Sequence, residues 1–309
     1  MRKVVNRTHV EGYLYQHTLE LKESGPNSKN PGTKFISGNI EVATDDAMVN
    51  IVPVHFTYVT ATTASGKENA TFGTLMNIIN GVIPCVMKDG ADRAGMIRID
   101  SAIGLNEFYS DRNGKEELVS VKRNEGGFVH ATNSLDEDEN NRNTFECDII
   151  ITNVRHVDGD EEKGVDEKAI VKGAVFNFRN ELLPVELSVL NPNAMSYFEG
   201  LEASPKNPVF TKVKGRQVSK VITRTIEEEG AFGTSVREVK NTQKDFVITW
   251  ALKEPYLWDD ESTITATEMT ELMAKREVAL ADMKARQDEY KASKNAPINM
   301  APAAGAFNF

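Results

Sequence analysis

The sequence predicts a mainly β protein with two consecutive small β domains, followed by a C-terminal amphipathic α-helix and a flexible tail. Roughly the first 250 residues form short runs rich in β-branched and aromatic residues, separated by Gly, Pro, Asn and Asp. Residues 267–294 are instead rich in Ala, Glu, Lys, Met and Arg, which favour a helix. The chain has 309 residues, 40% of them hydrophobic, which is enough for two cores.

The first domain is expected to span residues 1–157. Its candidate strands are residues 8–21, 35–44, 51–60, 96–103, 117–122 and 145–154. Between Phe72 and Ile83 the apolar residues recur at helical intervals and the pattern stops at Gly81, which predicts one short helix after the third strand. Five or six strands with a helix in this position are the layout of an OB-like β-barrel.

A second OB-like barrel is predicted for residues 169–258. The charged segment 158–168, which contains Gly159 and Gly164 and has no periodicity, is interpreted as an acidic linker between the domains. After it the β pattern restarts, with candidate strands at residues 169–179, 182–190, 208–218, 220–227 and 246–252. A short helix is expected at residues 194–201.

The C-terminal helix is predicted for residues 265–294, where Thr265 and Glu268 have the spacing of a capping box. Its apolar stripe has a period near 3.5 residues but is interrupted by Arg276 and Gln287. Either the helix packs on a domain or a partner, or it self-associates and makes the chain a homo-oligomer. Residues 295–309 are expected to be disordered, with Phe307 and Phe309 at the tip.

Several classes of protein are excluded by composition. The sequence has no apolar stretch long enough to cross a bilayer, and its N-terminus becomes polar too early for a signal peptide, so we expect a cytoplasmic protein without membrane contact. Cys85 and Cys147 lie far apart and are interpreted as reduced core residues. A net charge of −10 argues against a uniformly basic coat for nucleic acid.

No pattern typical of catalysis is present. The sequence lacks a phosphate-binding loop, a Gly-x-Ser-x-Gly elbow, a His-Glu-x-x-His motif and a Cys-x-x-Cys pair. Its five histidines have no ligand spacing, and the run that starts at Asp158 does not complete a calcium loop. We therefore expect no enzyme, no catalytic residue, no metal and no cofactor.

A basic segment without acidic residues is the strongest chemical signal. Its cations are Lys206, Lys212, Lys214, Arg216, Lys220 and Arg224. In an extended strand alternate residues share a face, so Phe210 is predicted to lie beside Lys212, Lys214 and Arg216 while Val209 and Val213 point inward. An aromatic ring among cations is what single-stranded nucleic acid needs for stacking and phosphate contacts. The alternative is a solvated outer face with one aromatic residue.

The first domain offers a weaker version of the same pattern. Tyr13 and Tyr15 share one strand face and Phe56 and Tyr58 share another, and only one pair can lie on a binding surface while the other fills the barrel. We favour Tyr13 and Tyr15 outside. Further candidates, each of which could equally be a core or plain surface residue, are Lys34, Phe35, Arg98, Phe108, Tyr109, Arg112, Lys122 and Arg123.

The first 150 or so residues resemble the single-stranded DNA-binding proteins of bacteria and their phages. The resemblance lies in Asn6-x-x-x-x-Glu11-Gly12-x-Leu14, Lys34-Phe35-Ile36-Ser37-Gly38-x-Ile40-x-Val42-Ala43-Thr44, Ile51-Val52-Pro53-Val54-His55-Phe56, the helix with Gly81, and Ile97-Arg98-Ile99-Asp100-Ser101. It implies an OB-fold with aromatic and basic residues on the barrel face, and no catalysis. Two β domains and a long helix exceed the one-barrel plan, which favours a tandem, phage-type version.

The resulting prediction is non-sequence-specific binding and protection of single-stranded DNA during replication or recombination. Replication or recombination proteins are the expected partners of the tail, although its last fifteen residues contain no acid. The alternative is a non-enzymatic structural or assembly protein of a phage, which low aromatic content (7%) and the acidic net charge favour. A nucleic-acid enzyme would need a carboxylate cluster, and the one at residues 136–139 is interpreted as a loop.

Overall fold

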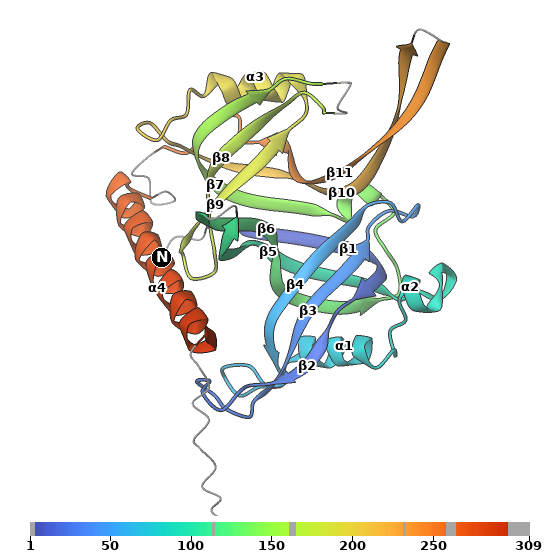
Figure 1. Ribbon diagram of the computed structural model, residues 1–309, viewed down its shortest axis with the longest axis vertical. Helices are drawn as coiled ribbons and strands as arrows, with labels where there is room; N and C mark the ends of the chain where they lie inside the picture. The colour runs from blue at the N-terminus through green and yellow to red at the C-terminus, as the bar shows by residue number, and fades with distance from the viewer. Residues whose placement is uncertain (1–3, 113–114, 161–164, 231–232, 258–263, 296–309) are drawn as a thin grey trace, which may run out of the picture.

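The computed structural model describes residues 4–112, 115–160, 165–230, 233–257 and 264–295, and within them the chain is mainly β with one long C-terminal helix (Figure 1). Eleven strands of this described part form one large mixed sheet in the order β10-β11-β9-β8-β7-β1-β5-β6-β4-β3-β2. The mainly β class and the C-terminal helix predicted from the sequence are therefore confirmed. No helix within the described ranges is long and apolar enough to cross a membrane.

Five strands of the N-terminal half close on themselves. The elements are β1 (Asn6–His17), β2 (Glu20–Glu23), β3 (Lys34–Ala43), β4 (Ile51–Thr60), α1 (Ala70–Ile79), α2 (Val86–Asp89), β5 (Met96–Arg112) and β6 (Lys115–Thr132). Strand β1 pairs with β3 and β5, β3 pairs with β4, β4 runs parallel to β6, and β6 pairs with β5. These pairings form a closed circuit, which we call the first circuit, around a core that includes Val10, Leu14 and Phe56.

The C-terminal half repeats this order of pairing. Its elements are β7 (Thr144–Val157), β8 (Lys168–Phe176), β9 (Leu182–Val189), α3 (Pro192–Gly200), β10 (Val209–Gly230) and β11 (Gly233–Ala251). Strand β7 pairs with β8 and β10, β8 pairs with β9, β9 runs parallel to β11, and β11 pairs with β10. We call this closed set the second circuit, and helix α3 lies between its third and fourth strands as α1 does in the first.

The observed strands differ from the predicted ones in several places. The strand predicted at residues 8–21 is divided into β1 and β2, β5 and β6 extend beyond their predicted ends, and β11 begins at Gly233 instead of residue 246. Strand β10 runs unbroken through both segments predicted at residues 208–227, because nothing at residue 219 interrupts its pairing with β11. The acidic segment 158–168 connects β7 to β8, whose ends pair directly through Val157 and Lys168. It therefore joins neighbouring strands of the second circuit.

The two circuits are joined by pairing between β1 and β7, which we call the seam. Asn6, Arg7 and Thr8 pair with Cys147, Glu146 and Phe145 in antiparallel register. The side-chain amide of Asn6 donates to the carbonyls of Ile103 (3.0 Å) and Phe176 (2.9 Å). Its oxygen accepts from the N–H of Ile103 at 3.0 Å. One asparagine thus ties the seam to strands of both circuits.

Three β-bulges change which side chains face the solvent. In β4 (residues 57–58) and β6 (Gly126 and Gly127), two residues lie opposite one residue of the neighbouring strand. In β11, Thr249 is an extra residue between two residues that pair with consecutive residues of β10. A bulge reverses the inward and outward alternation beyond it. As a result Tyr58, Phe128 and Trp250 are 46%, 67% and 45% exposed.

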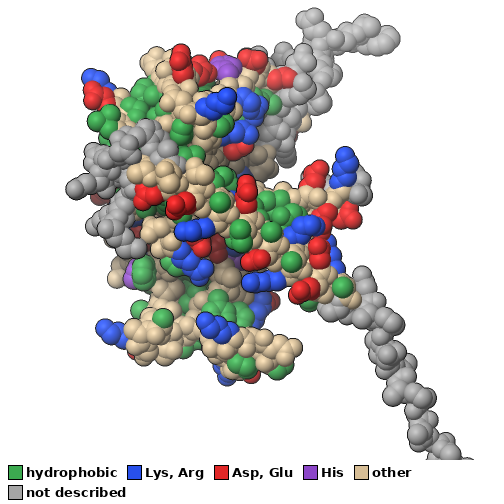
Figure 2. Space-filling view, turned by 90° about the vertical axis from the view of Figure 1, so that its left-hand side faces the viewer, with side chains coloured by type: hydrophobic (Ala, Val, Ile, Leu, Met, Phe, Trp, Pro, Cys, Tyr) green, Lys and Arg blue, Asp and Glu red, His purple; other side chains and the backbone are tan. Residues whose placement is uncertain are grey.

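Helix α4 (Ala266–Asn295) lies along the side of the molecule (Figure 1), and on that side Lys and Arg side chains are interspersed with Asp and Glu (Figure 2). It begins with the predicted capping box, in which the N–H of Thr265 donates to Glu268 at 2.8 Å and the N–H of Glu268 donates to Thr265 at 3.1 Å. Arg276 forms an ion pair with Glu107, and Gln287 bonds both backbone groups of Tyr109, at 3.2 and 2.7 Å. The two residues that interrupt the apolar stripe therefore dock the helix.

The far end of α4 is fastened by Lys284 and Lys291, which both donate to Glu116 of β6. These hydrogen bonds lower the pKa of Glu116 to about 2. Because this folded-state pKa lies below the ordinary value for Glu, the two contacts persist through mildly acidic pH and are lost only as the pH falls towards that value. At the near end, Met269 and Leu272 pack against a core cluster that contains Ile264.

Closure of the first circuit predicts a specific sensitivity at Gly12 of β1. A Cβ atom at Gly12 would lie 2.0 Å from the carbonyl oxygen of Ala43 in β3, so Gly12→Ala forces these paired strands apart. We expect it to lower the free energy of unfolding by about 1–3 kcal/mol, measured by urea denaturation. Gly73→Ala in α1 is the matched control, since nothing lies within 4 Å of its Cβ position. It should stabilise the helix by up to about 1 kcal/mol.

Candidate nucleic-acid interface

The seam is the floor of an open cleft with a volume of about 1280 Å³, which we call the seam cleft. One wall comes from β1, β5 and β6 of the first circuit and the other from β10 and β11 of the second. The floor residues are Arg7, Thr8, Thr144, Phe145 and Glu146. The walls and one end are formed by His9, Asp100, Ser101, Phe128, Asn140, Asn141, Lys214, Gly215, Arg216, Thr249 and Trp250.

Two exposed aromatic side chains lie on opposite walls of the seam cleft. Phe128 comes from β6, directly after the bulge at Gly126 and Gly127, and pairs with Asp100 across the strands. Trp250 comes from β11, directly after the bulge at Thr249. Exposed rings in a cleft provide flat surfaces on which nucleic-acid bases can stack.

Three cations accompany these rings. Arg7, Lys214 and Arg216 are exposed, and Lys214 Nζ lies 5.2 Å from the centroid of the Trp250 ring. Lys214 is also 4.0 Å from Glu146, and Arg216 donates to the side-chain oxygen of Asn140. The acids of the cleft, Asp100 and Glu146, only partly offset these charges. Cations next to stacking surfaces suit a chain of phosphates.

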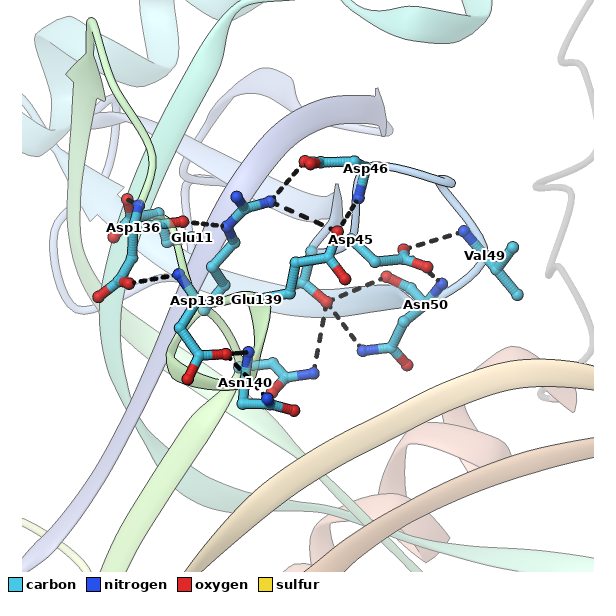
Figure 3. Close-up of polar contacts among 12 residues, drawn as sticks. Glu11, Asp45, Asp46, Val49, Asn50, Asp136, Asp138, Glu139 and Asn140 are labelled. Carbon is cyan, nitrogen blue, oxygen red and sulfur yellow. Dashed lines mark hydrogen bonds and ion pairs between the residues drawn. The ribbon is translucent and has the colours of Figure 1, made fainter.

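The end of the cleft is formed by a loop that contains Asn140 and Asn141 and that a buried arginine holds in place. Figure 3 shows the polar contacts of this loop around Asp136, Asp138 and Asn140. Arg142 is 5% exposed, and its guanidinium donates to the carbonyl of Asp136 at 2.6 Å and to Asp46 at 2.7 Å. Glu11 accepts from the N–H of Asp136 at 2.8 Å, and its own N–H donates to the carbonyl of Arg142 at 2.7 Å. The loop with Asn140 therefore has a fixed position.

The carboxylates of this loop accept hydrogen bonds from backbone N–H groups, two of them within the loop and one at Asp46. Asp136 accepts from the N–H of Asp138, and Asp138 accepts from the N–H of Asn140, both at 2.9 Å. Glu139 accepts from the N–H of Asp46 at 2.7 Å. Among the residues that the structure describes, no group of three or more His, Cys, Asp or Glu side chains is placed to hold a metal ion. The acidic run serves as a structured turn at the rim of the cleft.

A family model describes most of this sequence. The model of the YorF family matches residues 4–286, which includes both circuits and most of α4. The chain belongs to the YorF family. No curated protein matches its sequence.

Two solved structures are similar to this YorF-family chain, and both are of the single-stranded DNA-binding protein from Thermus aquaticus. A deletion mutant of that protein is 12% identical with a TM-score of 0.44, over 85% of this chain and 99% of the other. The wild-type protein is 11% identical with a TM-score of 0.42, over 85% and 98%.

In this YorF-family chain the basic segment is only partly exposed. Lys214 and Arg216 line the seam cleft as described, but the prediction that Phe210 shares their exposed face is wrong. Phe210 is 1% exposed and packs against Phe176 and Tyr256, with ring centroids 6.2 and 5.1 Å away. Tyr256 and Ile264, which precede α4 in the chain, belong to the cluster that buries Phe210, and alternation within one strand cannot reveal such a contact.

The remaining cations of the basic segment have different surroundings. Lys212 is half-buried, 3.4 Å from Glu146 and 3.9 Å from Asp148. Lys206 and Lys220 are exposed, and Lys220 lies beyond the cleft. Arg224 pairs with Val239 through its backbone, and its side chain lies outside the described side chains.

The β5–β6 candidates are largely occupied by contacts within the chain. Lys284 of α4 lies 5.1 Å from the ring centroid of Tyr109, while Phe108 is 40% exposed. Lys122 donates to the carbonyl of Glu186 and to Asp245, and burial lowers its pKa while Asp245 opposes that shift. Arg123 is paired with Glu125 at 2.5 Å. The side chain of Arg112 lies outside the described side chains.

One of the two aromatic pairs predicted in the first circuit does not share a strand face. Phe56 is fully buried whereas Tyr58 is exposed, so the prediction that they share a face is wrong because the β4 bulge lies between them. Tyr58 lies 4.4 Å from Phe35, measured between ring centroids. The other candidates are placed as follows: Tyr13 and Tyr15 are half-buried, Lys34 is exposed, and Arg98 contacts Glu11 at 3.0 Å. Phe307 and Phe309 lie outside the described residues.

Sequence reasoning missed Arg7, Phe128 and Trp250. The consecutive glycines Gly126 and Gly127 could have indicated a bulge before Phe128 from the sequence, and in the structure both have positive φ. Trp250 gave no such sign, since unbroken alternation places it with Phe246 and Ile248 on the inner face. In the structure the residue that continues this inner face is Ala251.

The buried arginine predicts how the rim of the cleft responds to mutation. Arg142→Met keeps much of the volume but removes the donors to Asp136 and Asp46, so the loop should open more often. We expect faster amide hydrogen exchange at Asn140 and Asn141, by a factor of about 5–30 if one such bond contributes 1–2 kcal/mol. Lys206→Met is the matched control at an exposed position. Unchanged exchange at both asparagines would contradict this role of Arg142.

Proposed function

We propose that this chain binds single-stranded DNA without sequence specificity and that the seam cleft holds the strand. The observation that carries the proposal is the pair of exposed rings, Phe128 and Trp250, on opposite walls of a cleft that also contains three exposed cations. Bases from a flexible strand can stack on such rings, while a duplex keeps its bases stacked on one another. The cleft thus suits a single strand.

The cations give the proposed binding its second component. Arg7, Lys214 and Arg216 would contact phosphates and release their condensed counterions, which makes binding weaken as salt rises. Neither stacking nor phosphate contact distinguishes one base from another strongly. The net charge of −10 does not oppose this, because local charges act over about one Debye length, roughly 8–10 Å in physiological salt.

We further infer that each circuit is an OB-type barrel. In both, the pairing follows the order first, second, third, fifth and fourth strand, the third and fifth strands are parallel, and a helix (α1 or α3) follows the third strand. On this basis we place the domain boundary before Thr144, so that β7 opens the second barrel. The function proposed here is binding without catalysis.

The biological setting follows from the sequence resemblance alone. Protection of single-stranded DNA during replication or recombination, in the cytoplasm of a bacterium or a phage host, stays a prediction. The same holds for recruitment of replication or recombination proteins through Phe307 and Phe309.

Removal of the aromatic side chains provides the main test. Trp250→Ala and Phe128→Ala should each weaken binding of an oligothymidine by about tenfold, because one stacked base contributes roughly 1–3 kcal/mol. Fluorescence anisotropy of a labelled oligonucleotide at low salt measures the dissociation constant. The double variant should lose more than either single variant.

Phe178→Ala provides the matched control, because Phe178 is 89% exposed but does not line the seam cleft. Its affinity should equal that of the native chain. If the native chain fails to bind at low salt, or if the control loses as much affinity as the cleft variants, the proposal is wrong. Salt-independent association without oligonucleotide binding would favour the alternative of a structural or assembly protein.

The salt dependence of binding tests the role of the cations separately. Arg216→Gln should reduce the slope of log Kd against log salt by about 0.7, the value for one phosphate contact on a single strand. Arg93→Gln changes the charge equally at an exposed site outside the cleft and should leave the slope unchanged. Equal slopes for the native chain and Arg216→Gln would exclude a phosphate contact at this residue.

A further inference from the structure

Strands β10 and β11 leave the body of the molecule together as a two-stranded arm (Figure 1). The arm consists of residues 219–230 and 233–244, paired in continuous register from Ser219 and Lys244 to Gly230 and Gly233. Val221 and Val236 on the arm are 55% and 65% exposed. A two-stranded ribbon surrounded by water is at best marginally stable, and a flat strand edge invites further pairing. Apart from Ser219 and Gln243, every side chain of the arm that the structure describes is exposed, so these side chains contribute little packing that would stabilise the ribbon.

Charge is divided along the length of the arm. The half next to the body, residues 219–225 and 239–244, contains four cations and no acid: Lys220, Arg224, Lys240 and Lys244. The outer half, residues 226–230 and 233–238, contains Arg237 and four acids: Glu227, Glu228, Glu229 and Glu238. We call the inner, positively charged half the base of the arm and the outer, mainly acidic half its tip. The base and the tip have complementary charges when two arms lie antiparallel.

A groove of about 260 Å³ lies at the base of the arm. Val49, Ile51 and Pro53 of the first circuit and Val221 of the arm supply its apolar lining, and Val49 is 48% exposed. Lys220 and Lys244 flank it. Glu41 also lines it, but its carboxylate accepts from the side-chain amide of Gln16 at 2.7 Å, and no ion pair of either lysine is found within the described chain. The groove therefore offers an apolar surface between two cations that have no partner in the described chain.

We propose that the arm is a self-association element and that its partner is a second copy of this chain. Two arms pack antiparallel about a twofold axis, so that the acidic tip of each copy lies at the basic groove of the other. Such an isologous contact uses the same surface twice and closes at two copies. It buries the exposed valines, satisfies both sets of charges, and gives each ribbon neighbouring strands.

The charge pattern favours a second copy over nucleic acid as the occupant. The four lysine and arginine residues of the base could contact phosphates, but a strand that continues along the arm would meet three consecutive glutamates at the tip. Like charges at close range disfavour such a complex. A second arm matches both halves. The inference does not depend on the seam cleft, because the arm and its groove use different residues.

Charge reversal tests the contact. The tip variant carries E227K, E228K and E229K, and the base variant carries K220E, K240E and K244E. Light scattering coupled to size exclusion should give the native chain twice its 34.2 kDa mass at high concentration, with dissociation on dilution or at raised salt. Each variant alone should be monomeric, with the dimer dissociation constant raised about tenfold or more. An equimolar mixture of the two should again form dimers, because each tip then meets a base of opposite charge.

A matched control reverses three exposed lysines elsewhere, K29E, K67E and K206E, and should dimerise like the native chain. Circular dichroism and thermal unfolding establish that every variant is folded. A native chain that is monomeric at all concentrations, variants that still dimerise alone, or a mixture that stays monomeric would each overturn the proposal. If the native chain is monomeric and the base variant also loses oligonucleotide binding, the arm binds nucleic acid instead.

Discussion

The backbone pairing of Asn6, Arg7 and Thr8 with Cys147, Glu146 and Phe145 determines the rest of the architecture. It makes β1 a member of the first circuit and a neighbour of the second. Near this pairing, buried amide side chains hold the two circuits together. Asn124 donates to the side-chain oxygen of Gln217 at 2.6 Å, and Asn50 donates to the backbone carbonyl of Gln217 at 3.2 Å. Buried polar groups that need partners allow few alternative arrangements. The floor of the cleft and the position of its walls therefore have one common origin.

The sequence was informative wherever local chemistry decides the outcome. Residues 72–83 and 194–201 were expected to be short helices and lie close to α1 and α3, and the spacing of Thr265 and Glu268 correctly indicated how the last helix begins. The sequence did not indicate which strands pair with one another. Nothing in residues 144–157 indicates that they pair with β1, β8 and β10 at once, because such pairing depends on residues far away in the chain.

The candidate site shows the same limit at the level of single side chains. Lys214 and Arg216 were found because simple alternation holds along that part of β10. Trp250 was missed and Phe210 misplaced, for different reasons: a bulge reversed the alternation before Trp250, and a distant segment covered Phe210. Strands that close into a small circuit need bulges to bend. The device that closes the circuit is therefore also the one that turns Phe128 and Trp250 outward and hides them from sequence patterns.

The contact of Gln287 with Tyr109 has a consequence for the solubility of the chain. Strand β1 pairs only with Met96–Ser101 of β5, so the outer half of β5 has a long edge without a neighbouring strand in the described part of the chain. The amide of Gln287 bonds the N–H and C=O of Tyr109, as the backbone of an added strand would. Exposed strand edges are templates for aggregation. Helix α4 thus covers this edge of β5 and keeps it from pairing with a strand of another molecule, which explains why polar residues interrupt the apolar stripe of the helix.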